Sequence, residues 1–185
     1  KTTLLRILMG LETPDKGSAV PEIRPESAIS AVFQENRLLG YADALDNIRI
    51  AGGRRGLCCT PQEVLQNLIE PEAWQKRTEL LSGGMQRRVA LARALAVRSG
   101  LILMDEPFVG LDPIAAHELK EIMAEHCRNG GAIFFSTHVL EVAEKLCDNV
   151  AIIKNGKLIA HGAMDSVRGD GSLEQVFLEL EDHKD

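Results

Sequence analysis

The stretch Leu101-Ile102-Leu103-Met104-Asp105-Glu106 consists of four apolar residues that run directly into two acidic ones. A short continuous apolar run is typical of a buried central strand in a parallel sheet. Because open α/β sheets bind ligands at the carboxyl ends of their strands, such a strand would deliver both acids to that edge. Asp105 would hold a hydrated Mg²⁺, and Glu106 would orient or deprotonate an attacking water molecule. The alternative is that the two acids only begin a solvated loop.

Helices and strands are predicted to alternate on both sides of this stretch. The expected order is helix Gly84–Arg98, strand Leu101–Met104, helix Pro113–Cys127, strand Ala132–Phe135 and helix Leu140–Cys147. Such alternation predicts an α/β fold with a mainly parallel sheet and right-handed crossovers. After these elements, the runs Asn149–Lys154 and Lys157–His161 flank Asn155-Gly156, a pair suited to a tight turn. We therefore expect a hairpin behind the parallel sheet.

Helical signals dominate the region between about residues 43 and 98. Thr60-Pro61-Gln62-Glu63 has the form of a capping box with proline at the first helical position. This region is expected to form a small helical subdomain within a single domain over residues 1–185. Helices are also expected over Lys1–Leu11 and over Ser172–Leu180, where Ser172 and Gln175 form a second possible capping box. Ala28–Phe33 is predicted to be a short strand.

Composition excludes several classes of protein. At 185 residues and 45% hydrophobic content, the chain has the size and the apolar content of one ordinary domain. The net charge of −6 argues against a dedicated nucleic-acid binder, because such domains usually carry a basic face. The four cysteines follow no metal-ligand spacing and are expected to be reduced thiols. No apolar run approaches the roughly 18 to 20 residues that cross a bilayer, so any membrane role requires a partner.

The segment Leu81-Ser82-Gly83-Gly84-Met85-Gln86-Arg87-Arg88 has the features of a phosphate-binding turn. Its glycines let the backbone approach a phosphate closely, and Ser82 and the following helix offer hydroxyl and N–H donors. Alone, the segment would be an ordinary helix cap with flexible glycines. Followed by Val89–Leu95, it resembles the LSGGQ signature of the ABC ATPase family, with Met85 inserted before Gln86 as the one departure. The resemblance implies a P-loop NTPase core.

Other family positions follow in order along the whole chain. Lys1-Thr2-Thr3 fits the tail of the phosphate loop G-x-x-x-x-G-K-[ST], although the glycines are absent. Gln34 is similar to the glutamine loop that senses Mg²⁺ and water and faces the membrane partner. Gly110-Leu111-Asp112 is similar to the loop that couples two sites, and His138 to the switch histidine that contacts the γ phosphate. Taken without the other family positions, a histidine after a strand is usually a surface or core residue.

The resemblance assigns roles to these positions. It implies that the catalytic residues are Glu106, His138 and Gln34. It implies that ATP is held by Lys1, Thr2, Thr3, Gln34, Ser82, Gly83, Gly84, Gln86, Asp105, Asp112 and His138. It implies that Mg²⁺ is bound by Thr2, Gln34 and Asp105.

The expected function is that of an ATPase subunit of a transporter. In the family, two such domains face each other head to tail, so the phosphate loop of one meets the signature of the other. The expected partners are a second ATPase domain and a transmembrane permease, with the chain peripheral on the cytoplasmic face of the cell membrane. No nucleic-acid partner is expected. Because the chain opens inside the phosphate loop, we expect it to be truncated there and, by itself, to bind ATP poorly and to be inactive.

Two other functions remain open, and the direction of transport is open as well. One alternative is a soluble ABC-type ATPase that acts on ribosomes or DNA, and another is a regulatory domain that does not hydrolyse ATP. Similarity to bacterial exporters of drugs, peptides or ions is found in Ser136–Glu141, in Lys154-Asn155-Gly156-Lys157 and in the terminal Val176–Leu180. Phe33–Leu39 is instead similar to importers of small organic anions.

Overall fold

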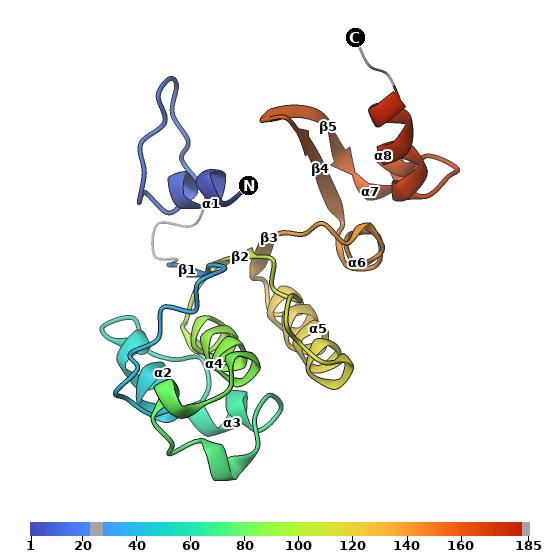
Figure 1. Cartoon of the computed structure of the whole chain (residues 1–185). Coiled ribbons are helices and arrows are strands. Elements are labelled where there is room, and N and C mark those ends of the chain that lie inside the picture. Colours follow the sequence, from blue (N-terminus) through green and yellow to red (C-terminus); the bar gives the residue numbers. More distant parts are fainter. Residues whose placement is uncertain (23–27, 183–185) are drawn as a thin grey trace. The chain divides into compact units, whose positions relative to one another are not determined.

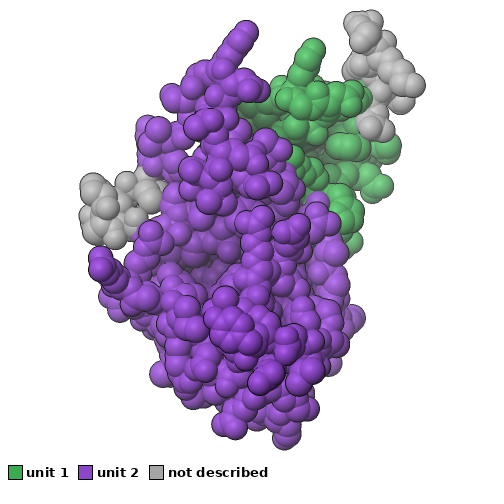
Figure 2. Space-filling view, turned by 60° about the vertical axis from the view of Figure 1, so that its left-hand side comes forward, with its two compact units in different colours: residues 1, 137–185 green, residues 2–136 purple. Residues whose placement is uncertain are grey.

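The computed structural model describes residues 1–22 and 28–182, and contacts divide the chain into two units. The larger unit comprises residues 2–136, and the smaller unit comprises residue 1 with residues 137–185. Figure 2 shows the larger unit in purple and the smaller unit in green. Each unit has its own cluster of buried apolar side chains. The two units are therefore described separately.

The larger unit is built on a three-stranded parallel sheet. Its strands are β1 (Ile29–Val32), β2 (Leu101–Asp105) and β3 (Ala132–Ser136), in the order β1-β2-β3. The central strand β2 is buried from Ile102 to Asp105, as its apolar run predicts. In the register, Asp105 lies opposite Ser136. The predicted α/β fold with a parallel sheet is thus confirmed.

Helices of the larger unit lie on both sides of this sheet (Figure 1). They are α1 (Thr2–Leu8), α2 (Ala44–Gly52), α3 (Pro61–Leu65), α4 (Gly83–Ala96) and α5 (Pro113–Arg128), with short 3₁₀ turns at Pro71–Ala73 and Thr78–Leu80. Helix α4 contacts α2, α3 and β1, and its residues Val89, Ala90, Leu91 and Ala92 are fully buried. A helix with neighbours on several sides buries apolar residues on several faces, which the run Val89–Ala92 supplies. Helix α4 is therefore the central element beneath the sheet.

The helices between residues 44 and 96 do pack on one another, but the limits of a separate subdomain there stay a prediction. Helix α4 begins at Gly83, one residue before the expected start, and ends at Ala96 rather than Arg98. Helix α1 ends at Leu8 instead of Leu11, because Gly10 follows with φ of 70°, in the left-handed region. The remaining boundaries agree with the expected ones within two residues.

The predicted capping box at the start of α3 is present. The Thr60 hydroxyl accepts from the backbone N–H of Glu63 at 3.2 Å, and the Glu63 carboxylate accepts from the backbone N–H of Thr60 at 2.7 Å. Two N–H groups that would lack partners at a helix start are thereby satisfied. Pro61 occupies the first helical position, where no N–H is required.

Replacing Thr60 with alanine is expected to lower the free energy of unfolding by about 1 kcal/mol, because α3 loses its cap. Urea denaturation of the chain measures this change. The matched control is Gln62→Ala, an exposed substitution within the same helix that leaves both capping bonds in place. Equal stability of the Thr60 and Gln62 variants would show that the cap contributes nothing.

The described part of the smaller unit, residue 1 and residues 137–182, contains an antiparallel hairpin and three helices. Strands β4 (Asn149–Lys154) and β5 (Lys157–Ala163) pair as predicted. Asn155 and Gly156 have φ of 48° and 77°, as a two-residue turn with the strand twist requires. Helices α6 (Leu140–Leu146), α7 (Met164–Arg168) and α8 (Leu173–Asp182) complete the unit. Only α7 had no sequence signal that predicted it.

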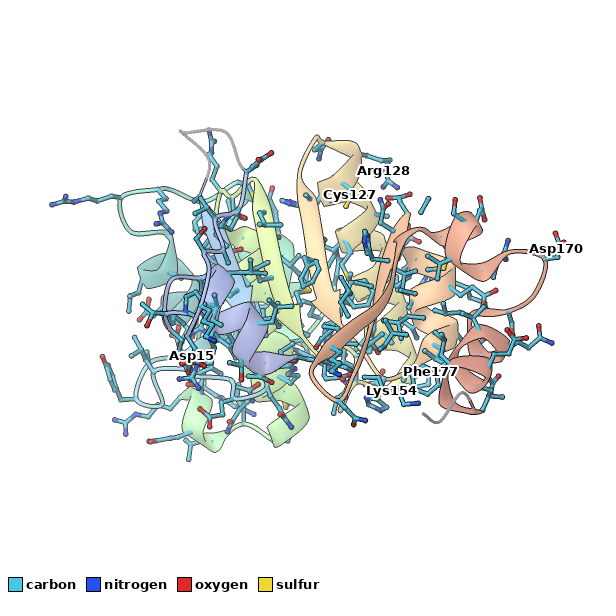
Figure 3. All side chains as sticks on the ribbon, turned by 90° about the horizontal axis from the view of Figure 1, so that it is seen from above. Asp15, Cys127, Arg128, Lys154, Asp170 and Phe177 are labelled. Atoms are coloured by element: carbon cyan, nitrogen blue, oxygen red, sulfur yellow. The ribbon has the colours of Figure 1, made fainter. Side chains whose placement is uncertain are left out.

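Side chains of the smaller unit tie α8 to the hairpin. The Lys154 ammonium, at the end of β4, donates to the carbonyl oxygen of Leu180 in α8 at 2.9 Å; Figure 3 labels Lys154 and, from the same helix α8, Phe177. The second predicted capping box is present, since the Ser172 hydroxyl accepts from the backbone of Gln175 at 3.2 Å and the Gln175 side chain accepts in return. Across residues 1–22 and 28–182, no helix is both long and apolar enough to cross a membrane.

Candidate functional site

Asp105 occupies the carboxyl end of β2, and its side chain is held on both oxygens. It is only 2% exposed, and one oxygen accepts from the Ser136 hydroxyl at 2.5 Å. The other oxygen accepts from the Thr2 hydroxyl at 2.5 Å, across 103 positions of sequence. Thr2 and Asp105 are two of the three predicted Mg²⁺ ligands, and the structure brings these two together at the edge of the sheet.

Glu106 has a backbone conformation that is uncommon outside glycine. Its φ of 50° lies in the left-handed region, which costs of order 1–3 kcal/mol for such a residue. The surrounding structure holds it there: its N–H donates to the Ser136 carbonyl at 3.1 Å, and its own carbonyl accepts from Arg87 at 3.0 Å. A strained residue that is fixed from two sides, directly after a buried acid, is typical of a functional site.

Four predicted site residues line one hollow in the larger unit. Gln34, Gly83, Gly84 and Glu106 come from three separate parts of the chain and share this hollow of about 190 Å³. Pockets that enclose a drug-sized ligand are usually about 300–1,000 Å³. The hollow of one chain is therefore too small to enclose a nucleotide, and its lining residues do not include Thr2 or Asp105.

Gly83 and Gly84 begin α4 behind Ser82, which caps the helix. The Ser82 hydroxyl accepts from the backbone N–H of Met85 at 3.3 Å. A Cβ atom added to Gly83 would meet no atom within 4 Å, so nothing in the chain itself requires a glycine there. The backbone of this glycine turn (Ser82-Gly83-Gly84) is open to an approaching group. Gln86, by contrast, donates to the Leu81 carbonyl at 3.1 Å, within its own turn.

Asp112 has both carboxylate oxygens bound within the chain. One oxygen accepts from the backbone N–H groups of Ile114 and Ala115, each at 3.0 Å, and so caps α5. The other accepts from the Arg88 guanidinium, which also donates to the Leu68 carbonyl at 3.2 Å. Asp112 therefore connects α4 to α5, and its predicted contact with nucleotide stays a prediction.

Lys1, Thr3 and His138 are the remaining predicted site residues. In the smaller unit, the Lys1 ammonium donates to the Thr137 carbonyl at 2.8 Å. His138 is the next residue along the chain, and its side chain is exposed. Thr3 is exposed in the first turn of α1. The roles of these three positions stay predictions.

Two residues of the site, Ser136 and Arg87, were not predicted. Ser136 bonds both to the Asp105 carboxylate and to the Glu106 backbone; a signal for it exists, because neighbouring parallel strands end at the same edge. Arg87 donates to the carbonyl oxygens of Asp105 and Glu106. Burial lowers the pKa of Arg87, an effect that the charge of Asp105 opposes. Nothing in the sequence marks this arginine as buried rather than exposed.

Comparison with known families and solved structures agrees with this architecture. A family model described as ABC transporter matches residues 1–109. A solved structure described as an ATP binding subunit of an ABC transporter superimposes with a TM-score of 0.87, at 28% identity, over 98% of this chain and 83% of that one. A dimeric ATP-binding cassette in a post-hydrolysis state, bound to ADP and Pi, gives a TM-score of 0.74 at 25% identity and covers 88% of this chain and 79% of its own.

Curated relatives point the same way. A Nod factor export ATP-binding protein I from Cupriavidus metallidurans is 35% identical, over 100% of this chain and 67% of the relative. An aliphatic sulfonates import ATP-binding protein from Xanthomonas axonopodis is 34% identical, over 85% of this chain and 56% of the relative. The chain thus spans between about half and two thirds of the length of such relatives. It belongs to the ABC transporter family, as an ATP-binding domain of the class that hydrolyses ATP.

Proposed function

We propose that the protein containing this chain binds ATP and hydrolyses it, and thereby drives a solute across a membrane through a transmembrane partner. The observation that carries the proposal is the bond between the Thr2 hydroxyl and the Asp105 carboxylate, with the strained Glu106 directly after it. A hydroxyl and a carboxylate at the edge of a parallel sheet are the groups with which nucleoside triphosphatases hold the Mg²⁺ that accompanies the phosphates.

The donor set fits magnesium. Thr2 and Asp105 offer hard oxygen atoms in mutual contact, and exposed Gln34 adds an amide oxygen from the loop after β1. Bound Mg²⁺ would neutralise part of the charge on the β and γ phosphates. The Ser136 hydroxyl keeps the Asp105 carboxylate oriented, because it donates to the oxygen that Thr2 does not bind.

In this proposal the remaining residues have distinct tasks. Glu106 accepts a hydrogen bond from the attacking water and orients it or removes its proton. The Lys1 ammonium supplies positive charge for the β and γ phosphates, and the His138 imidazole donates to a γ-phosphate oxygen. That hydrogen bond is lost when the phosphate leaves, so the site can distinguish ATP from ADP.

The site is proposed to be completed by a second copy or a second ATPase domain. The hollow beside Glu106 is about 190 Å³, which is too small to enclose a nucleotide. The glycine turn is exposed at Ser82 and Gly83, with room for an approaching phosphate. One of the structural neighbours is itself a dimer bound to ADP and Pi. If ATP binds the closed pair of domains more tightly than the open pair, bound ATP would favour the closed pair. Hydrolysis of the ATP would then favour the open pair.

The proposal places the protein on the cytoplasmic face of the membrane, held there by its permease partner. Its relatives are named for export as well as for import, so the proposal extends to solute transport and not to a cargo. Phosphate release from MgATP tests the ATPase step, with EDTA and a non-hydrolysable ATP analogue as controls. Uptake or release of solute by vesicles that contain the permease tests the coupling. Absence of Mg²⁺-dependent phosphate release from the complete protein would refute the proposed function.

A further inference from the structure

We infer that Arg87 is a positioning residue. Its side chain bonds the backbone of the acid pair (Asp105 and Glu106) and the backbone just before Gln34, and it thereby holds both to helix α4, which begins at the glycine turn. The inference rests on the proposed function, which makes Glu106 and Gln34 part of an ATPase site. It adds a residue to which the family signature assigns no contact with ATP. Three contacts of one buried guanidinium carry it.

The Arg87 guanidinium bonds three backbone carbonyls. One nitrogen donates to the carbonyl oxygen of Phe33 at 2.5 Å, and another donates to those of Asp105 at 2.8 Å and Glu106 at 3.0 Å. The residue is 6% exposed, so its charge has lost most of its contact with water. A buried charge is tolerated when it is hydrogen-bonded, and the planar guanidinium offers several donors in a fixed arrangement. Lysine has no such fork of donors.

These carbonyls belong to the parts of the chain that matter for hydrolysis. Phe33 directly precedes Gln34, and the other two carbonyls belong to the acid pair itself. The peptide groups around Glu106 are held from both sides, by Ser136 at its N–H and by Arg87 at its carbonyl. Because Glu106 has φ of 50°, it stays in that conformation only while such contacts hold it. Loss of Arg87 removes the contacts on one side.

Arg87 also connects the acid pair to the glycine turn. It lies four residues after Gly83, which is about one turn of α4, so the two move together as parts of one helix. A displacement of the glycine turn by a phosphate would therefore be transmitted to the backbone of Glu106 and to the start of the Gln34 loop. Within one chain, Arg87 provides a direct hydrogen-bonded connection between these three regions.

The same helix offers a matched control in Arg93. Its guanidinium donates to the carbonyl oxygens of Arg37 at 2.7 Å and Asn36 at 3.1 Å. Burial lowers the pKa of Arg93, as it does that of Arg87. The two arginines thus share the helix, the desolvated charge and the bonding to backbone carbonyls. The two bonds of Arg93 go to the loop after Gln34, whereas two of the bonds of Arg87 reach the acid pair.

The experiment compares Arg87→Met with Arg93→Met in the complete protein. For Arg87→Met we expect kcat for MgATP to fall by about tenfold or more, while KM changes by less than about threefold. Arg93→Met leaves the bonds to the acid pair in place but loosens the loop after Gln34, so its kcat should fall at least about threefold less than that of Arg87→Met. Hydrogen exchange followed by mass spectrometry gives a second readout without catalysis: peptides spanning residues 101–110 should exchange at least about tenfold faster in Arg87→Met alone.

Arg87→Lys tests the geometry of the bonds and replaces Arg87→Met if that variant does not fold. It keeps the charge but not the fork, so kcat should lie between those of the parent and Arg87→Met, with faster exchange in the same peptides. Equal losses of kcat and of thermal stability in the Arg87 and Arg93 variants would reduce Arg87 to a structural role and overturn the inference. So would unchanged exchange at residues 101–110. Absence of ATP hydrolysis in the parent would instead refute the proposed function, while the exchange comparison would still decide the role of Arg87.

Discussion

Replacing Glu106 with glutamine is expected to lower the turnover number for MgATP by about 100-fold or more, with little change in the free energy of unfolding. Glutamine keeps the size of the side chain and the backbone bonds to Ser136 and Arg87, but its amide cannot take a proton from water. Proton transfer by a positioned side chain contributes typically 10²–10⁴-fold to a rate. ATP should still bind, because Thr2 and Asp105 are untouched.

Phosphate release measures the turnover number, and size-exclusion chromatography with MgATP shows whether the unhydrolysed nucleotide holds two copies together. The matched control is Glu121→Gln, which removes an exposed carboxylate from α5 and should leave turnover unchanged. Turnover and transport that both survive in Glu106→Gln would show that the acid is not the base. If Glu106→Gln lost hydrolysis because it unfolded, its thermal stability would be lower than that of Glu121→Gln.

Much of the local structure could be predicted because its causes are local. The apolar run before Asp105 predicts a buried strand, since a run of four residues has the length of a strand and is too short for a helix. The capping box at Thr60 and the turn at Asn155-Gly156 satisfy backbone groups within three or four residues. Such signals do not depend on the rest of the fold, so the sequence alone is sufficient to read them.

The contacts that assemble the site could not be predicted in this way. The bond between Thr2 and Asp105 spans 103 positions, and only the family resemblance placed the two residues in one site. Arg87 and Arg88 are adjacent and chemically identical, yet Arg87 is buried against the acid pair while Arg88 bonds Asp112. Which face of α4 meets the sheet depends on the packing of the whole larger unit. The left-handed conformation of Glu106 likewise follows from contacts at both ends of its peptide groups.

Replacing Gly83 with aspartate is expected to abolish ATP turnover without unfolding the chain. A side chain at Gly83 meets no atom within 4 Å, and an acidic residue in the first turn of a helix interacts favourably with the helix dipole. The free energy of unfolding should therefore stay equal or rise slightly. A carboxylate at this position would, however, face the triphosphate held by a second copy. Like charges about 4 Å apart repel by about 4 kcal/mol at an effective dielectric constant of about 20.

Such a repulsion corresponds to a loss of binding of more than about 100-fold, because each 1.4 kcal/mol is a factor of ten. ATP-dependent pairing of Gly83→Asp, followed by analytical ultracentrifugation, should accordingly disappear together with phosphate release. Gly83→Ala is the matched control: it adds the same Cβ without the charge, so it should pair and hydrolyse ATP more readily than the aspartate variant.

A mixture of Gly83→Asp chains with Glu106→Gln chains tests which copy supplies each part of an ATP site. If each site takes its glycine turn from one copy and its acid from the other, a mixed pair contains one site with both defects and one with neither, so partial turnover should return. Two sites each built within a single chain would leave both copies defective, and no mixture would recover.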